Sequence, residues 1–129
     1  MLKTVNGKQV EMTQKEIFKF NASLPTADEV FLKIKKEKCK EIDTATAKAI
    51  TDLVGSYINQ RNLTAKSVQL TLKETRGTIT EDETVQLNTL NDLFAQVETL
   101  RVTGNDKEAQ IMATATQEEL EAKCLELGV

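Results

Sequence analysis

The sequence predicts a mainly α-helical protein, in which a long helix packs with a second amphipathic helix and short C-terminal helices, after a small N-terminal β-hairpin. Three observations support this class. Ala, Leu, Glu, Lys and Gln are plentiful and Pro25 is the only proline, a composition that favours helix. Helix-start signals of the form Thr-x-x-Glu recur, each before apolar residues at helical spacing. An Asn-Gly pair near the start separates two short apolar runs.

The length and composition indicate one folded domain. The chain has 129 residues, of which 40% are apolar and 29% charged, which is ordinary for a globular protein with its own core. We expect residues 1–25 to hold the hairpin and a short helix, and residues 26–129 to form a helical domain, together one structural unit. No segment approaches 18 uninterrupted apolar residues, so we expect no membrane span.

The first elements are expected between residues 2 and 21. Asn6-Gly7 suits a type I′ turn, which predicts a hairpin over about residues 2–12. Thr13 and Glu16 then form a capping box, which predicts a helix over about residues 14–21. Leu24-Pro25 ends this segment, because the residue before a proline is disfavoured in a helix.

The same cap signal marks later helix starts. It recurs at Thr26–Glu29, Thr80–Glu83 and Thr116–Glu119, with Asn105–Glu108 as a weaker relative. The first predicts the longest helix, from Ala27 to about Asn59, where Gly55 offers a place to bend or stop.

The remaining segments are expected as follows. Val68, Leu70 and Leu72 alternate with polar residues, so we favour a strand or extended segment between residues 62 and 77, with a helix through it as the alternative. We expect an amphipathic helix from Thr80 to about Val102, and a turn at Gly104 and Asn105. Short helices over about 106–113 and 117–127 would follow, the last ending at Gly128 as a C-cap glycine.

Charge divides the chain unevenly. Residues 1–66 carry 12 basic and 8 acidic side chains, whereas residues 67–129 carry 5 and 12. This favours packing of the two halves against each other, or head-to-tail contact between copies. The lysines of the densest basic run, Lys33 to Lys40, scatter around a helix axis with no aromatic residue or arginine between them. A solvated helix surface is therefore favoured over a nucleic-acid site.

No pattern of residues indicates catalysis, a cofactor or a metal. The chain has no histidine and no phosphate-binding or nucleophile-elbow motif. The acidic runs Glu81–Glu83 and Glu118–Glu121 begin helices, where the helix dipole explains them. Cys39 and Cys124 lack metal-ligand spacing and are expected to be buried or half-buried free thiols. We therefore expect a protein that is not an enzyme.

Several stretches resemble small proteins from the tail modules of tailed bacteriophages and prophages. They are VNGKQVEMTQKEI, SLPTADEVFLKIKKEKCKEIDTATAKAI, VQLNTLNDLF and IMATATQEELEA. The resemblance implies a tail accessory or tail-fibre assembly protein, chaperone-like, in the cytoplasm of the bacterial host or in the virion. It also implies a tail or fibre protein as partner.

Such a role requires an apolar helical contact surface. The expected surface combines the stripe on the second amphipathic helix with apolar residues of the long helix: Leu90, Leu93, Phe94, Val97, Leu100, Ile42, Ile50, Leu53 and Tyr57. These residues could mediate self-association through helices, or most of them could form the core of the monomer. A second function stays open, a cytosolic regulatory or DNA-associated protein that uses the Lys33 to Lys40 segment.

Overall fold

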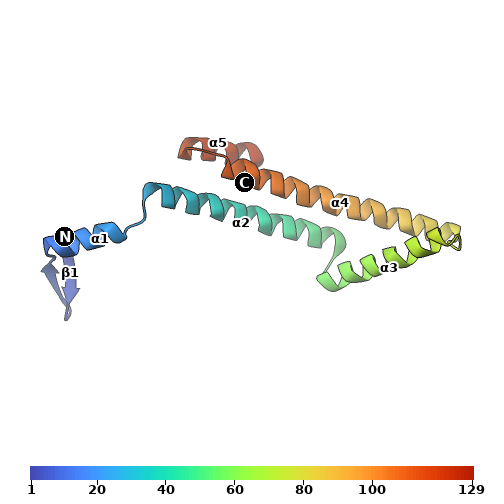
Figure 1. Ribbon diagram of the computed structural model, residues 1–129, viewed down its shortest axis with the longest axis horizontal. Coiled ribbons are helices and arrows are strands. Elements are labelled where there is room, and N and C mark those ends of the chain that lie inside the picture. The colour runs from blue at the N-terminus through green and yellow to red at the C-terminus, as the bar shows by residue number, and fades with distance from the viewer. The chain divides into compact units, whose positions relative to one another are not determined.

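The computed structural model describes residues 1–129 and groups them into two compact units, residues 1–34 and 35–129. The sequence predicted a boundary between the two parts of the chain after residue 25. In the structure the first compact unit extends to Ile34 and so includes the start of the long helix. The predicted class is confirmed (Figure 1). The elements in order are β1 Leu2–Val5, β2 Lys8–Glu11, α1 Gln14–Ser23, α2 Ala27–Val54, α3 Tyr57–Thr75, α4 Glu81–Met112 and α5 Gln117–Leu127.

The N-terminal hairpin forms as predicted. β1 and β2 pair antiparallel, from Leu2 opposite Glu11 to Val5 opposite Lys8. Asn6 and Gly7 have φ angles of 49° and 76°, the left-handed conformations that a type I′ turn requires. Asn-Gly therefore sets the register of the two strands.

Helix α1 begins at the predicted cap. The backbone N–H of Glu16 donates to Thr13 Oγ1 at 3.2 Å. The Glu16 carboxylate accepts a hydrogen bond from Lys3 Nζ at 2.7 Å, which ties the helix to β1 and lowers the pKa of Glu16. The helix ends at Ser23, shortly before Pro25.

Helix α2 begins at the Thr26–Glu29 box and stops earlier than Asn59, the predicted end. The box is complete: the Glu29 N–H donates to Thr26 Oγ1 at 3.1 Å, and the Thr26 N–H donates to the Glu29 carboxylate at 3.2 Å. The helix ends at Val54 because Gly55 takes a left-handed φ of 83°. Gly55 is thus the stop that its position suggested.

The break between α2 and α3 is held by polar side chains. Asn59 Nδ2 donates to the carbonyl oxygen of Val54 at 2.6 Å, and Gln60 Nε2 donates to that of Gly55 at 3.0 Å. Ser56 Oγ accepts from the Asn59 N–H at 3.3 Å and caps α3. The end of one helix and the start of the next therefore share one set of hydrogen bonds.

The predicted strand within residues 62–77 is wrong, and the alternative of a helix is correct, because α3 covers most of this segment. Leu63 and Leu70 pack toward α4, whereas Val68 and Leu72 are exposed on the other side of the helix. A helix with apolar residues on two opposite sides places them two positions apart, which imitates the alternation of a strand.

The predicted turn at Gly104 and Asn105 is also wrong. Helix α4 begins at the Thr80 capping box, as predicted, and runs without interruption to Met112. The separate helix expected over 106–113 is its last part, so the weaker cap at Asn105 lies inside the helix. Gly104 is buried in α4 and faces α2.

Helix α5 confirms the prediction for residues 117–127. The Glu119 N–H donates to Thr116 Oγ1 at 3.1 Å, while the Glu119 carboxylate accepts from the Ala115 N–H at 2.8 Å. Gly128 ends the helix in the left-handed region with φ of 71°.

In the C-terminal unit, α3 and α5 pack against α4, and α2 approaches it more locally (Figure 1). Its N-terminal half meets α3 in an apolar cluster made of Leu63, Leu70, Ile79, Leu87, Leu90 and Phe94. Its C-terminal half runs antiparallel to α2, where Lys35 Nζ donates to the carbonyl oxygens of Met112 and Thr114 at 3.2 and 3.1 Å. Helix α5 packs beside the C-terminal end of α4. None of the helices has the length and apolarity needed to cross a membrane.

Candidate partner-binding groove

The structure places three of the nine expected contact residues inside the core. Ile42, Leu90 and Val97 are only 4%, 8% and 9% exposed. Phe94 is half-buried and packs on the α3–α4 cluster. These four side chains stabilise the monomer, which is the alternative that the sequence left open.

The other expected residues are more accessible. Leu53, Leu93, Leu100 and Ile50 are half-buried, and Tyr57 is fully on the surface. Among them, Leu53 of α2 and Leu100 of α4 line the same surface depression. The structure thus brings together one expected residue from each of the two long helices.

This depression, the α2–α4 groove, is a solvent-open trough of about 730 Å³. Its lining residues are Ala49, Asp52, Leu53, Ala95, Gln96, Thr99 and Leu100. Small side chains at Ala49 and Ala95 leave space between the helices, and the two leucines supply the apolar surface. An apolar trough with a few polar groups is the type of surface that accepts the apolar side of a helix or peptide.

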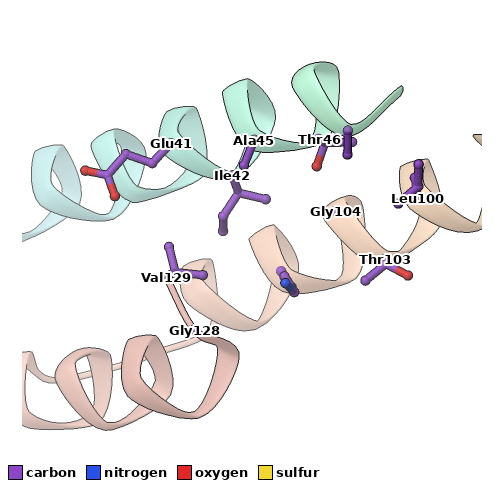
Figure 2. Close-up of a pocket in the computed structure, with 11 residues that line it drawn as sticks. Glu41, Ile42, Ala45, Thr46, Leu100, Thr103, Gly104, Gly128 and Val129 are labelled. Carbon is purple, nitrogen blue, oxygen red and sulfur yellow. The ribbon is translucent and has the colours of Figure 1, made fainter. Parts of the chain in front are cut away.

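A smaller cavity of about 240 Å³ continues from the groove and shares Ala49 and Leu100 with it. Figure 2 shows Ile42 pointing from α2 toward α4, with Val129 reaching the same space from the end of α5. The cavity also has a charged side chain from each long helix, Glu41 and Lys107. The accessible apolar surface therefore runs along the α2–α4 contact, toward the end that α5 covers.

The position of α2 on α4 depends on Gly104. A Cβ atom at this position would lie 2.5 Å from Thr46 Oγ1, which is closer than such atoms approach, and 3.3 Å from its Cγ2, which is a tight contact. The absence of a side chain at residue 104 lets the two helices come together here, while the groove stays open about one to two and a half turns away along α4. Gly104 was predicted to form a turn, and the predicted contact surface did not include the small residues Ala49 and Ala95. The signal for Ala49 was the row of small residues on α2, of which Ala45 is another member and lines the cavity.

Two carboxylates meet at the α2–α4 contact outside the groove. Asp43 of α2 lies close to Glu108 of α4, and the interaction between the two carboxyl groups, together with burial, raises the pKa of Glu108. Cys39 lies beside them, with Sγ 3.8 Å from the carbonyl oxygen of Glu108. Burial, and then these two carboxylates, raise the pKa of the thiol, which favours the unreactive protonated form. Cys124 is buried, so both cysteines are the free, partly or fully covered thiols that were predicted.

The acidic residues of the chain form no group of three or more side chains that could hold a metal ion. Glu83, in one of the acidic runs, has a structural role. It forms a salt bridge with Lys73 of α3 and completes the Thr80 capping box, and both contacts lower its pKa.

The basic segment is partly engaged within the chain. Lys35 binds the carbonyl groups that end α4, and Lys38 forms a salt bridge with Glu41 at 3.2 Å. No contact of this segment favours the DNA-associated alternative.

No protein-family model, curated protein or solved structure matches the chain. The resemblance to phage tail-module proteins stays a prediction. Function is therefore inferred from the groove and from the sequence pattern together.

Proposed function

We propose that this protein is a non-enzymatic assembly protein of a phage or prophage tail, which holds an apolar helical segment of a tail or tail-fibre protein in the α2–α4 groove. The role is that of a tail accessory protein or an assembly chaperone. It requires an accessible apolar surface on a stable helical frame and no reactive side chains.

The observation that carries this proposal is the pair Leu53 and Leu100. Both leucines line the groove, one from each long helix, and both are only half-buried. A partner side chain placed between them would remove apolar surface from water on both walls, at about 25 cal/mol per Å². Asp52, Gln96 and Thr99 supply polar groups in the same lining, and these can hydrogen-bond the polar side of the incoming segment.

The setting comes from the resemblance of the sequence to tail-module proteins. The stretch SLPTADEVFLKIKKEKCKEIDTATAKAI extends through the start of α2 to Ile50, and VQLNTLNDLF forms part of α4. The resembling stretches therefore cover most of α2 and the first part of α4, and Ala49 is the one groove residue that lies within them. The stretch from Leu53 to Thr80, which includes α3, has no counterpart in the resemblance.

The test is recovery of tail proteins by tagged protein from its host after prophage induction, with identification by mass spectrometry. We expect the wild-type chain to recover a tail or fibre protein, and Leu53→Glu or Leu100→Glu to recover at least tenfold less. Val102→Glu is the control, because Val102 is exposed on α4 two residues from Leu100 and does not line the groove. Far-UV circular dichroism of each variant checks folding.

The proposal fails if folded Leu53→Glu and Leu100→Glu chains recover the tail protein as well as the control does. It also fails if no tail protein is recovered by the wild type. Presence of the wild-type chain in purified particles would identify a tail component, and its absence an assembly factor.

A further inference from the structure

Helix α3 has a second apolar side that nothing in the structure covers. Ile58, Val68 and Leu72 are 70%, 55% and 47% exposed, and the small Ala65 lies between them on the same side. Their separations of three, four and seven residues place them in one row, opposite the leucines that pack on α4. We call this row the outer face of α3.

The outer face is positively charged. Arg61 lies within the row and Arg76 continues it just after the helix, and neither belongs to a salt bridge of the chain. Glu74, the one acidic residue of α3, is four positions from Leu70 and so lies on the side that faces α4. A helix docked here would therefore be favoured by carboxylates beside its apolar residues.

Helix α5 presents a surface of that composition. Leu125 is 85% exposed, more than any other large apolar side chain of the chain. Glu118 and Glu121 precede it by seven and four positions, so all three lie in one outward row. This acidic row with a projecting leucine complements the outer face, where Ala65 leaves room between larger apolar side chains.

The two surfaces cannot meet within one chain. Helix α3 packs on α4 near Leu87 and Leu90, whereas the end of α5 lies near Gly104. Residues 90 and 104 are separated by ~21 Å along a helix that rises 1.5 Å per residue. Both rows also face away from α4, so only a second copy can bring them together.

We infer that copies of this protein associate head to tail, with α5 of one copy docked on the outer face of α3 of the next. The contact joins different surfaces, so it can repeat from chain to chain. An 11-residue helix is only ~16 Å long, which keeps the buried area well below the ~800 Å² per partner of a typical stable complex. The association is therefore weak, concentration-dependent and sensitive to salt.

The test is sedimentation velocity of the full chain from 10 to 500 µM in 50 mM and 500 mM NaCl. We expect the weight-average mass to rise with concentration at low salt and to rise much less at high salt. Arg61→Glu and Glu121→Arg should each reduce association severalfold, because each places like charges across the contact. An equimolar mixture of the two variants should recover it, since the reversed charge on α3 of one chain then meets the reversed charge on α5 of the other, and the pair is again attractive.

Arg101→Glu is the matched control. It makes the same change of charge on an exposed arginine of α4, which is outside both surfaces, and should leave association unchanged. Leu125→Ala should weaken association without a change of charge. A chain that stays monomeric throughout overturns the inference, as does association that survives both charge reversals or is not recovered in the mixture. Loss of head-to-tail contact leaves the α2–α4 groove intact, so failure here is distinguishable from failure of the proposed function.

Discussion

The two units of the chain are stabilised by different means. Residues 1–34 contain no buried side chain, and exposed apolar residues include Phe18 at 74% and Leu24 at 51%. Residues 35–129 bury side chains such as Leu70, Ile111 and Leu120 to 1% or less. The N-terminal unit is therefore held by local hydrogen bonds and the Lys3–Glu16 salt bridge, whereas the C-terminal unit has an apolar core. A two-stranded hairpin is marginal in water without such a core, so the two units should respond very differently to the same type of change.

The largest expected difference comes from truncation of apolar side chains. Leu70→Ala should lower the free energy of unfolding of the C-terminal unit by ~2–5 kcal/mol, because it leaves a cavity in the α3–α4 cluster. Phe18→Ala should change the free energy of unfolding of the N-terminal unit by no more than ~0.5 kcal/mol, since that ring is mostly exposed. Urea unfolding followed by circular dichroism measures both. Equal effects would mean that the N-terminal unit also has a core.

A smaller effect is expected where α2 meets α4. Gly104→Ala would stabilise an ordinary helix by ~1 kcal/mol, but here the new methyl group meets Thr46 and the overpacking costs more, for a net loss of about 1 kcal/mol. Thr46→Ala in the same chain removes the closest atoms and should restore stability. Thermal unfolding of the single and double variants measures this coupling. A stabilised single variant would show that α2 is free to move away from α4.

Loss of a helix cap should lower the global stability of the C-terminal unit but should have only a local effect in the N-terminal unit. Thr80→Ala removes the cap of α4 and should lower the global stability of the C-terminal unit by ~1 kcal/mol. Thr13→Ala removes the equivalent bond at α1, and we expect it to accelerate amide hydrogen exchange in residues 14–23 while the C-terminal unit unfolds as before. A shift of the C-terminal unfolding transition by Thr13→Ala would contradict independent units.

The smallest expected effect is the dependence of stability on pH, which has opposite signs in the two units. The pKa of Glu16 is lowered by Lys3, so its contribution is present above the pKa of the unfolded chain and is lost as pH falls through the folded value. The pKa of Glu108 is raised by Asp43 and by burial, so stability falls as pH rises from the unfolded to the folded value, and acid strengthens the α2–α4 contact. NMR titration of both carboxylates tests these directions. Glu108→Gln should slightly stabilise the protein at pH 7 and remove this part of the pH dependence.

Local signals in the sequence predicted much of the fold. Asn6-Gly7, the threonine caps and Gly128 act through bonds between near neighbours in the chain, so their outcome did not depend on distant packing. The errors arose where a contact between helices decided the structure. Gly104 lies inside α4, where its missing side chain allows Thr46 of α2 to approach, and it does not form a turn. The alternating apolar residues of α3 lie on two sides of one helix, one packed and one exposed.

The candidate site was predictable to a similar degree. Apolar spacing identified Leu53 and Leu100, but spacing alone could not separate them from Ile42, Leu90 and Val97, which the fold buries. Whether such a side chain is buried or accessible depends on the distance between neighbouring helices at its position. Small residues on the two facing helices determine that distance, and these residues lie in different segments of the sequence.

The break at Gly55 has a consequence for motion. The 32-residue helix α4 is covered by α3 along its N-terminal half and by α2 along its C-terminal half. Because α2 and α3 are separate helices, one can move away from α4 while the other stays in place. Release of α3 would expose Leu87 and Leu90 while Lys35 and Thr46 keep the other half of α4 in place. We therefore expect two steps of local unfolding along one continuous helix, in which the amides of each half of α4 exchange with solvent at their own rate.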